Sequence, residues 1–181
     1  MSENNRFEEE LRTYTCLKKI CENARERSLN PADKYAQKVL IPLSEKKAGE
    51  RRKEVARYFD TLHSKTDALF FLDMVARFEQ IVFDKIDNAS GQIRRIVKEL
   101  YAKPDPFSKI AASFVKNQDD IHSLRNVHNL LENHIPKYLS EQLAAIIEHR
   151  NFIAHGGRIG RPSPHSVEEI ALILDEILDH I

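Results

Sequence analysis

The segment that most constrains how this chain of 181 residues can fold is a long apolar stretch at residues 65–86. Plotted on a helix, its apolar side chains cover most of the circumference, and only one narrow stripe is polar. That stripe consists of Asp73, Arg77, Gln80 and Asp84. A helix that is apolar nearly all round is surrounded by other helices. We therefore expect this segment to form the central helix of an all-helical core, with its phenylalanines and methionine as core side chains and not as a ligand pocket.

The rest of the chain repeats apolar residues at helical spacing, and runs that alternate with period two are hard to find, so no sheet is expected. Further helices or apolar helical stripes are predicted at residues 4–27, 32–41, 55–62, 93–101, 107–116, 119–132, 136–155 and 167–181. The stretch at 93–101 either continues the helix before it through residues 88–91 or follows a break there. The prediction is an all-α fold: a single-domain helical bundle of about seven to eight helices over residues 1–181.

Two capping boxes and one proline-rich stretch mark where these helices should begin and end. Ser64-Lys65-Thr66-Asp67 and Ser166-Val167-Glu168-Glu169 each combine a hydroxyl side chain with an acid three residues later, which is typical of a helix start. Lys103-Pro104-Asp105-Pro106 is predicted to be a loop inside the domain, because the helices on both sides of it need partners.

Composition and charge do not point to a partner. Lys+Arg and Asp+Glu both number 28, so net charge neither favours nor excludes a nucleic acid. Residues 1–10 are acidic and polar, unlike a signal peptide. No apolar run approaches the roughly 18 residues of a transmembrane helix. We therefore expect a cytoplasmic protein that has no membrane partner.

Cysteine and histidine spacing predicts neither a disulfide nor a metal site. Cys16 and Cys21 are five residues apart and point in different directions on a helix, so reduced thiols are expected. His122, His128 and His134 fall six residues apart, whereas metal ligands on one helix favour spacings of three or four. We expect these histidines to lie at the surface or at helix caps, and we expect no metal and no cofactor.

The segment Arg150–Gly157, with the sequence RNFIAHGG, contains a charged residue where an apolar one is expected. With about 100° per residue, Arg150 projects from the middle of the apolar face of the predicted helix 136–155. That face consists of Leu139, Leu143, Ile146, Ile147, Ile153 and Ala154. A guanidinium keeps its charge, so burial without a partner is costly. A paired acid, a subunit interface or an anionic ligand would each account for it.

The end of the same helix carries two more polar side chains. Asn151 and His155 are four residues apart, so they lie on one side of the helix and flank Arg150. Gly156-Gly157 supplies the left-handed conformation that closes a helix at its C-terminus. The segment therefore presents an arginine, an amide and an imidazole near a helix end.

These three groups are the parts needed to cleave RNA without a metal. An imidazole can act as general acid or base, and a guanidinium can hold a phosphate through two hydrogen bonds. The histidine would assist attack of a ribose 2′-hydroxyl or protonate the leaving oxygen, while the arginine would stabilise the charge of the transition state. One histidine per chain is sparse for a reaction that needs an acid and a base. Two copies that face each other across a two-fold axis would supply both.

No acidic residue occurs from His149 through Val167. The same stretch carries the cationic or titratable residues His149, Arg150, His155, Arg158, Arg161 and His165. Such a one-signed stretch suits a phosphate backbone, and a mobile surface loop is the alternative interpretation. On position alone we predict that Arg158, Arg161 and His149 bind RNA and that Glu148 is a helper residue.

The spacing resembles the R-x4-6-H signature of the HEPN superfamily, since four residues separate Arg150 from His155 and polar Asn151 follows the arginine. The helix ending, the loop and the last amphipathic helix are similar to the C-terminal half of such domains, over residues 136–181. The resemblance implies a homodimeric, metal-independent endoribonuclease with two motifs in one cleft. It also implies a toxin–antitoxin or antiviral system, with an antitoxin or regulatory protein as a further partner. By carry-over, Arg150 and His155 are catalytic and Asn151 supports them.

Two other functions stay open. One is a non-catalytic module of the same fold that binds RNA or a nucleotide through the same cleft. The other is a purely structural helical interaction protein, in which Arg150 pairs with a buried acid such as Asp73 or Asp84.

Overall fold

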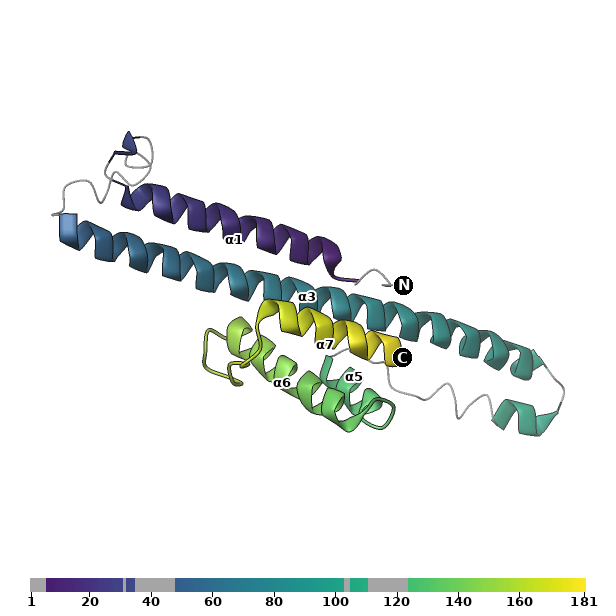
Figure 1. Ribbon diagram of the computed structural model, residues 1–181. Helices are drawn as coiled ribbons and strands as arrows, with labels where there is room; N and C mark the ends of the chain where they lie inside the picture. Colours follow the sequence, from purple (N-terminus) through teal and green to yellow (C-terminus); the bar gives the residue numbers. More distant parts are fainter. Residues whose placement is uncertain (1–5, 31, 35–47, 103–104, 111–123) are drawn as a thin grey trace. The chain divides into compact units, whose positions relative to one another are not determined.

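The computed structural model describes residues 6–30, 32–34, 48–102, 105–110 and 124–181. These ranges are helical and hold no strand, which confirms the predicted all-α class (Figure 1). The helices are α1 (Glu8–Leu29), α3 (Ala48–Ala102), α5 (Leu124–Leu131), α6 (Lys137–Ala154) and α7 (Val167–His180), with a helical turn at 106–110. In this part of the chain, no helix combines the length and the apolar character of a membrane span.

Some predictions fall on residues outside these ranges. The predicted helix at 32–41 lies almost wholly outside them, as do residues 111–116, 119–123 and His122. The single HEPN-like domain over residues 1–181 stays a prediction.

Helix α3 corrects the prediction of separate helices between residues 55 and 101, because it runs without a break for 55 residues. The expected cap at Ser64–Asp67 is wrong: the hydroxyl of Thr66 donates to the carbonyl of Leu62 at 2.9 Å, inside the helix. The helix also continues through residues 88–91. Gly91 costs a helix only about 1 kcal/mol relative to alanine, and no proline interrupts the segment.

Burial on α3 lies on one side, which corrects the expectation of a helix enclosed all round. Its buried side chains after residue 70 are Phe71, Met74, Val75, Phe78 and Val82. The predicted polar stripe is exposed as expected. The most continuously buried helix is α7, whose buried residues are Val167, Ile170, Ala171, Ile173, Leu174, Ile177 and Leu178.

The contacts of the chain divide into two compact units. The first unit holds Met1–Met74 and Pro164–Asp175, and the second holds Val75–Ser163 and Glu176–Ile181. Both α3 and α7 therefore contribute one part of their length to each unit.

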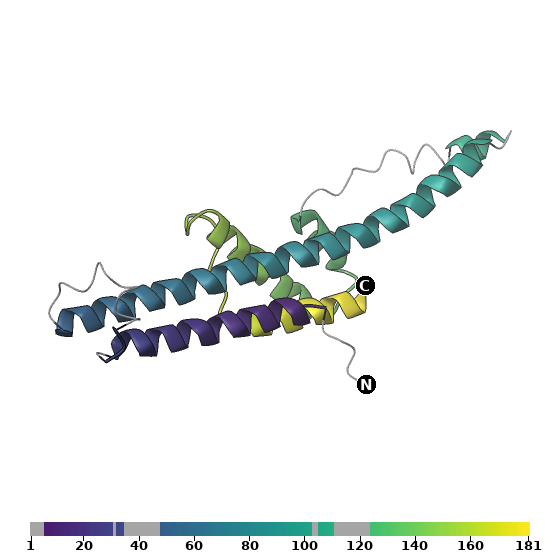
Figure 2. The ribbon, with the colours of Figure 1, turned by 90° about the horizontal axis from the view of Figure 1, so that it is seen from above.

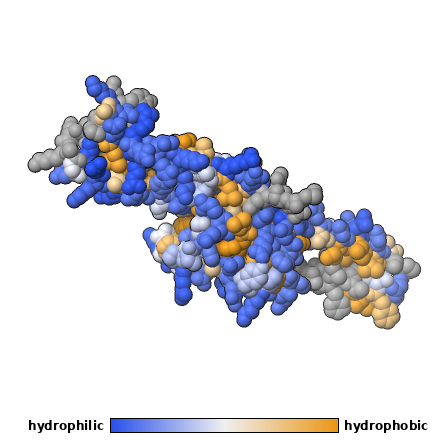
Figure 3. Space-filling view, in the orientation of Figure 1, coloured by the Kyte–Doolittle hydropathy of each residue, from blue (hydrophilic) through white to orange (hydrophobic). Residues whose placement is uncertain are grey.

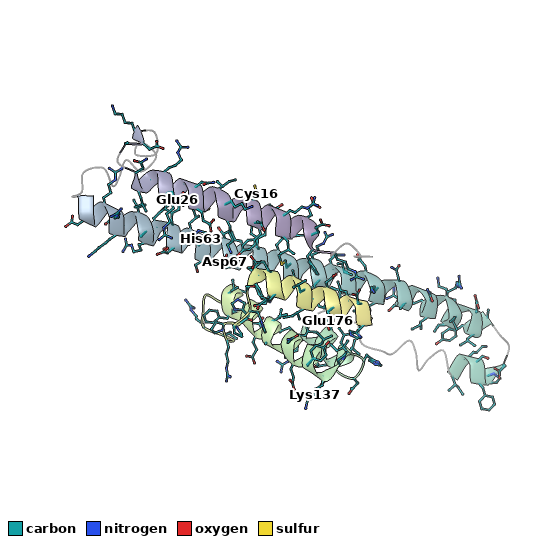
Figure 4. The ribbon with its side chains drawn as sticks, in the orientation of Figure 1. Cys16, Glu26, His63, Asp67, Lys137 and Glu176 are labelled. Carbon is teal, nitrogen blue, oxygen red and sulfur yellow. The ribbon has the colours of Figure 1, made fainter. Side chains whose placement is uncertain are left out.

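In the first unit, α1 runs antiparallel beside the first half of α3 (Figures 1 and 2). Ala24 of α1 packs against the buried pair Val55 and Phe59 near the start of α3. Farther along α3, the hydroxyl of Tyr14 donates to Asp67 at 2.7 Å (Figure 4). Burial and the nearby carboxylate both raise the pKa of this tyrosine, so it stays protonated and keeps donating. These contacts fix the register of the two helices.

The start of α7 closes the first unit. The predicted capping box is confirmed: the backbone N–H of Ser166 donates to the Glu169 carboxylate at 2.8 Å, and the backbone N–H of Glu169 donates to the Ser166 hydroxyl at 3.2 Å. The guanidinium of Arg6 bonds Asp175 at 2.9 Å, which ties the residues before α1 to α7.

The second unit is built on α5, α6 and the second half of α3. Helices α5 and α6 pack on each other, and the His128 imidazole lies 3.2 Å from both the hydroxyl and the carbonyl oxygen of Ser140. The Tyr138 hydroxyl donates to Glu176, at the end of the chain that belongs to this unit (Figure 4). Three side chains of α6 are fully buried, namely Leu139, Leu143 and Ile146. The predicted core face of this helix is therefore confirmed over its first part.

Candidate functional site

The candidate site lies at the C-terminal end of α6. The helix ends at Ala154 with His155 as its C-cap, one residue from the predicted end. The N–H of Gly156 donates to Ile153 at 3.1 Å, and the N–H of Gly157 donates to Phe152 at 2.7 Å. These two bonds, with Gly156 at φ +60°, make a Schellman motif, as the glycine pair predicted. The backbone direction of His155 is thus fixed by hydrogen bonds on both sides.

The loop after the helix folds back onto it. Gly160 has φ +87° and lies directly against the backbone of the last turns of α6. A Cβ atom at this position would collide with the carbonyl oxygen of Glu148 and lie 3.0 Å from the amide nitrogen of Phe152. Only glycine allows this close approach. The loop after α6 is therefore anchored to the helix at Gly160, and its two arginines, Arg158 and Arg161, are exposed beside the helix end.

Arg150 and Asn151 contact each other through their side chains. The Nη1 of Arg150 donates to the Oδ1 of Asn151 at 3.3 Å, and both side chains are half-buried. The bond uses one of the five guanidinium N–H groups, so donors remain for an anion. The amide oxygen of Asn151 holds the guanidinium at the end of the helix that also carries His155.

An acid on α3 accounts for part of the burial of Arg150. Glu79 is half-buried, and its pKa is raised by burial while the positive charge of Arg150 acts to lower it. The acids suggested by the sequence, Asp73 and Asp84, are both exposed, and Asp84 accepts a hydrogen bond from Gln80 at 2.8 Å. Glu79 is therefore the acid on which the charge of Arg150 acts, in place of the two suggested by the sequence.

Glu79 was missed although the sequence carries the signal that would find it. At about 100° per residue, it falls on the same face as Val75 and Val82, which are both buried. An acid on an apolar helix face is as unusual as Arg150 on its own face, and opposite charges on two apolar faces can be paired. The polar stripe that holds Asp73 points away from the core instead.

The imidazole of His155 is exposed to solvent at the helix end. Its backbone N–H donates to the carbonyl of Asn151 at 3.0 Å, and its own carbonyl accepts from the N–H of Arg158 at 3.4 Å. The side chain of Glu148 is also exposed, about two turns earlier on the helix. The structure therefore gathers Arg150, Asn151 and His155 at one helix end, with the imidazole accessible.

His149 occupies a different environment from the other predicted RNA-binding residues. Its ring stacks on Phe152 with centroids 6.3 Å apart and an interplanar angle of 16°. Burial lowers its pKa, while a hydrogen bond to the backbone of Arg161 acts in the opposite direction. The neutral imidazole that results suits a side chain that joins the loop to the helix more than one that binds phosphate.

The other histidines of the second unit that the structure describes do not gather around a common centre. His128 contacts Ser140, and His134 is exposed after α5. Among the described residues, no group of three or more histidine, cysteine or acidic side chains could hold a metal ion. Cys16 and Cys21 are both free thiols, as their spacing predicted.

Comparison of the chain with models of protein families, with curated proteins and with solved structures gave no match. The candidate site is therefore argued from its own residues.

Proposed function

We propose that this protein is a metal-independent endoribonuclease of HEPN type that acts as a homodimer. The observation that carries the proposal is the convergence of three groups at the end of α6: the guanidinium of Arg150, the amide of Asn151 that bonds it, and the exposed imidazole of His155. The anchored loop adds Arg158 and Arg161 beside them. This set suits a phosphodiester with a neighbouring hydroxyl group.

Each group has a chemical task in such a reaction. His155 takes the proton of the ribose 2′-hydroxyl as its oxygen attacks the adjacent phosphorus, or protonates the 5′-oxygen that leaves. Arg150 binds the non-bridging phosphate oxygens and stabilises the added negative charge of the transition state. Asn151 holds the guanidinium, and the exposed Arg158 and Arg161 bind the flanking phosphates.

The dimer follows from the need for two proton-transfer groups. One motif offers one exposed imidazole, and the neighbouring His149 is engaged with Phe152 and the loop. A second copy of the motif would supply the second imidazole. The resemblance to HEPN toxins further suggests a role in toxin–antitoxin or antiviral defence, with an antitoxin or regulatory protein that controls the activity.

The direct test is incubation of the purified protein with end-labelled single-stranded RNA in an excess of chelator. We expect cleavage products that end in a 2′,3′-cyclic phosphate or a 3′-phosphate, because the 2′-hydroxyl is the attacking group. Products with 3′-hydroxyl ends, or cleavage that stops in chelator, would contradict the mechanism.

Variants locate the activity. We expect Arg150→Ala and His155→Ala each to lower the cleavage rate at least about 100-fold with an unchanged circular dichroism spectrum. The matched controls are Arg125→Ala and His134→Ala, because both side chains are exposed in the same unit and lie outside the motif. They should cleave at the wild-type rate. Full activity in either motif variant would overturn the proposal.

A second candidate function, a helical interaction module without catalysis, is favoured by the charge of Arg150 acting on the half-buried Glu79. In that case Arg150 serves the fold alone. Arg150→Lys distinguishes between the two candidate functions. Lysine keeps the positive charge near Glu79 but lacks the planar guanidinium that binds a phosphate through two hydrogen bonds. The ribonuclease predicts a large loss of cleavage with an unchanged melting temperature. Wild-type protein that binds RNA or another partner, and never cleaves RNA, would favour the module.

A further inference from the structure

The apolar face of α3 extends beyond its buried part. Val75, Phe78 and Val82 are almost completely buried. At about 100° per residue, the same face continues through Ile86, Ile93, Ile96, Val97 and Leu100, all within about 60° of Ile93. Yet Ile93 is 45% exposed and Ile96 is 51% exposed.

The exposed apolar surface does not stop at the helix end. Tyr101, the last aromatic residue of α3, is 41% exposed, and beyond it Phe107 is 79% exposed and Ile110 is 51% exposed. Figure 3 shows apolar surface gathered where α3 ends and the turn at 105–110 follows. Apolar side chains that are concentrated in this way mark an interaction surface more often than isolated ones do.

Charges along one edge of this face indicate what covers it. Lys85, Gln92 and Glu99 recur every seven residues, lie about 80–120° to one side of Ile93, and are all exposed. In an antiparallel pair of these helices with Gln92 at the two-fold axis, Lys85 of each copy lies opposite Glu99 of the other. In a parallel pair, the same edge would face Ser90 and Val97, and the charges would find no opposite partner on the second helix. Glu99 would then keep the ion pair with Arg95 of its own helix, at 3.9 Å.

We propose that residues 86–100 of α3, which we call the α3 seam, form an antiparallel helix pair with the same residues of a second copy of this chain. The seam spans about 21 Å, and it buries Ile93 and Ile96 between two mirrored Lys85–Glu99 ion pairs. This inference goes beyond the proposed function, because none of these residues belongs to the motif on α6. An antiparallel pair centred on Gln92 places the two copies of Glu79, and with them the two motifs, about 39 Å apart along the helix axis. The α3 seam is therefore a separate contact from the one that brings two motifs into one site. A contact of about two heptads is small for a specific interface, so the dimer dissociates on dilution.

The first experiment measures molar mass by light scattering across a dilution series of the full-length protein. Because the seam and the contact between two motifs are separate, we expect the wild type to associate beyond a dimer as its concentration rises. Ile93→Glu should raise the dissociation constant of the seam contact at least about tenfold. The matched control is Gly91→Glu, which adds the same charge about 160° around the helix from Ile93, at an exposed position where a Cβ atom meets nothing within 4 Å. That variant should dimerise like the wild type. A molar mass that is the same in the wild type and in Ile93→Glu at every concentration would overturn the proposal, because the seam would then make no contact between copies of the chain.

The second experiment tests the antiparallel register with substitutions that leave the apolar side chains in place. Glu99→Lys should weaken the dimer, and Lys85→Glu combined with Glu99→Lys should restore it. Gln92→Cys, made together with Cys16→Ser and Cys21→Ser, should form a disulfide-linked dimer under mild oxidation, because the two Gln92 positions meet at the axis. A dimer that neither weakens nor cross-links uses another surface, and the proposal fails.

These results are independent of the ribonuclease proposal. RNA cleavage is measured on the same samples, and a chain that dimerises through the α3 seam but never cleaves RNA would contradict the ribonuclease alone. A chain that cleaves RNA with an unchanged rate and mass after Ile93→Glu would contradict the seam alone.

Discussion

At the scale of single residues, two opposite charges stand on apolar helix faces and act on each other. Arg150 belongs to the apolar face of α6, and Glu79 belongs to the apolar face of α3. Both are half-buried, so water screens their attraction only in part. The guanidinium therefore serves two groups, the acid behind it and, in the proposed reaction, the phosphate in front of it.

The first prediction concerns Glu79→Gln. Burial raises the pKa of Glu79 more than Arg150 lowers it, so the folded protein holds this proton more tightly than the unfolded chain does. The stability that the group contributes is present at low pH and is lost as pH rises through its raised pKa. Glutamine removes this dependence. The melting temperature of the variant minus that of the wild type should therefore increase from pH 4 to pH 8, by about 2 °C or less.

The control for that prediction is Asp73→Asn. Asp73 lies on the exposed stripe of the same helix, so its substitution should leave the difference in melting temperature constant over this pH range. A gain that is largest at pH 4 would show that Glu79 is stabilised as a carboxylate, and the argument from burial would be wrong.

At the scale of elements, the end of α6 and the loop after it form one structural piece. The Schellman bonds fix the direction of the chain at Gly156, and Gly160 sets the loop against the helix backbone. The stack of His149 on Phe152 adds a contact within the last turns of the helix. Arg158 and Arg161 are thereby carried by an anchored loop, which lowers the entropy cost of holding them beside a phosphate backbone.

The second prediction concerns Gly160→Ala. The new methyl group would collide with the carbonyl oxygen of Glu148, and the alanine would have to keep a positive φ, so the loop must move away from the helix. We expect a loss of about 1–3 kcal/mol in the free energy of unfolding, measured in urea, together with weaker RNA binding. The control is Gly91→Ala, where a Cβ meets nothing within 4 Å inside α3. It should stabilise the protein by about 0.5–1 kcal/mol. Equal effects of the two substitutions would contradict the anchored loop.

The helices show what the sequence can and cannot predict about elements. The end of α6 was predicted within one residue, because the positive φ that closes the helix favours glycine, and the glycine pair is visible in the sequence. The break predicted at Ser64–Asp67 within α3 was wrong, because a capping box describes what a helix start needs and not what prevents a helix from continuing. At Thr66 the hydroxyl bonds the preceding turn instead, and packing at Phe59 and Phe71 holds both sides in one helix.

At the scale of the whole molecule, the sequence predicted which residues form the candidate site, but not which side chains and segments surround and bury them. Arg150, Asn151 and His155 share a helix, so helical spacing alone places them together. The effect of Arg150 on Glu79 depends on how two distant segments pack, and spacing within one helix carries no information on that. The same holds for His149, whose burial depends on the loop that returns to it.

The composite active site is the central claim, and a mixing experiment tests it most directly. Wild-type protein and His155→Ala are combined in equal amounts, allowed to exchange subunits, and assayed for RNA cleavage in chelator. If each site needs both imidazoles, only dimers of two wild-type chains cleave, and the activity falls to about one quarter of that of the same total amount of wild type. An activity of about one half would show that each motif acts alone, and it would contradict a site shared by two copies of the chain.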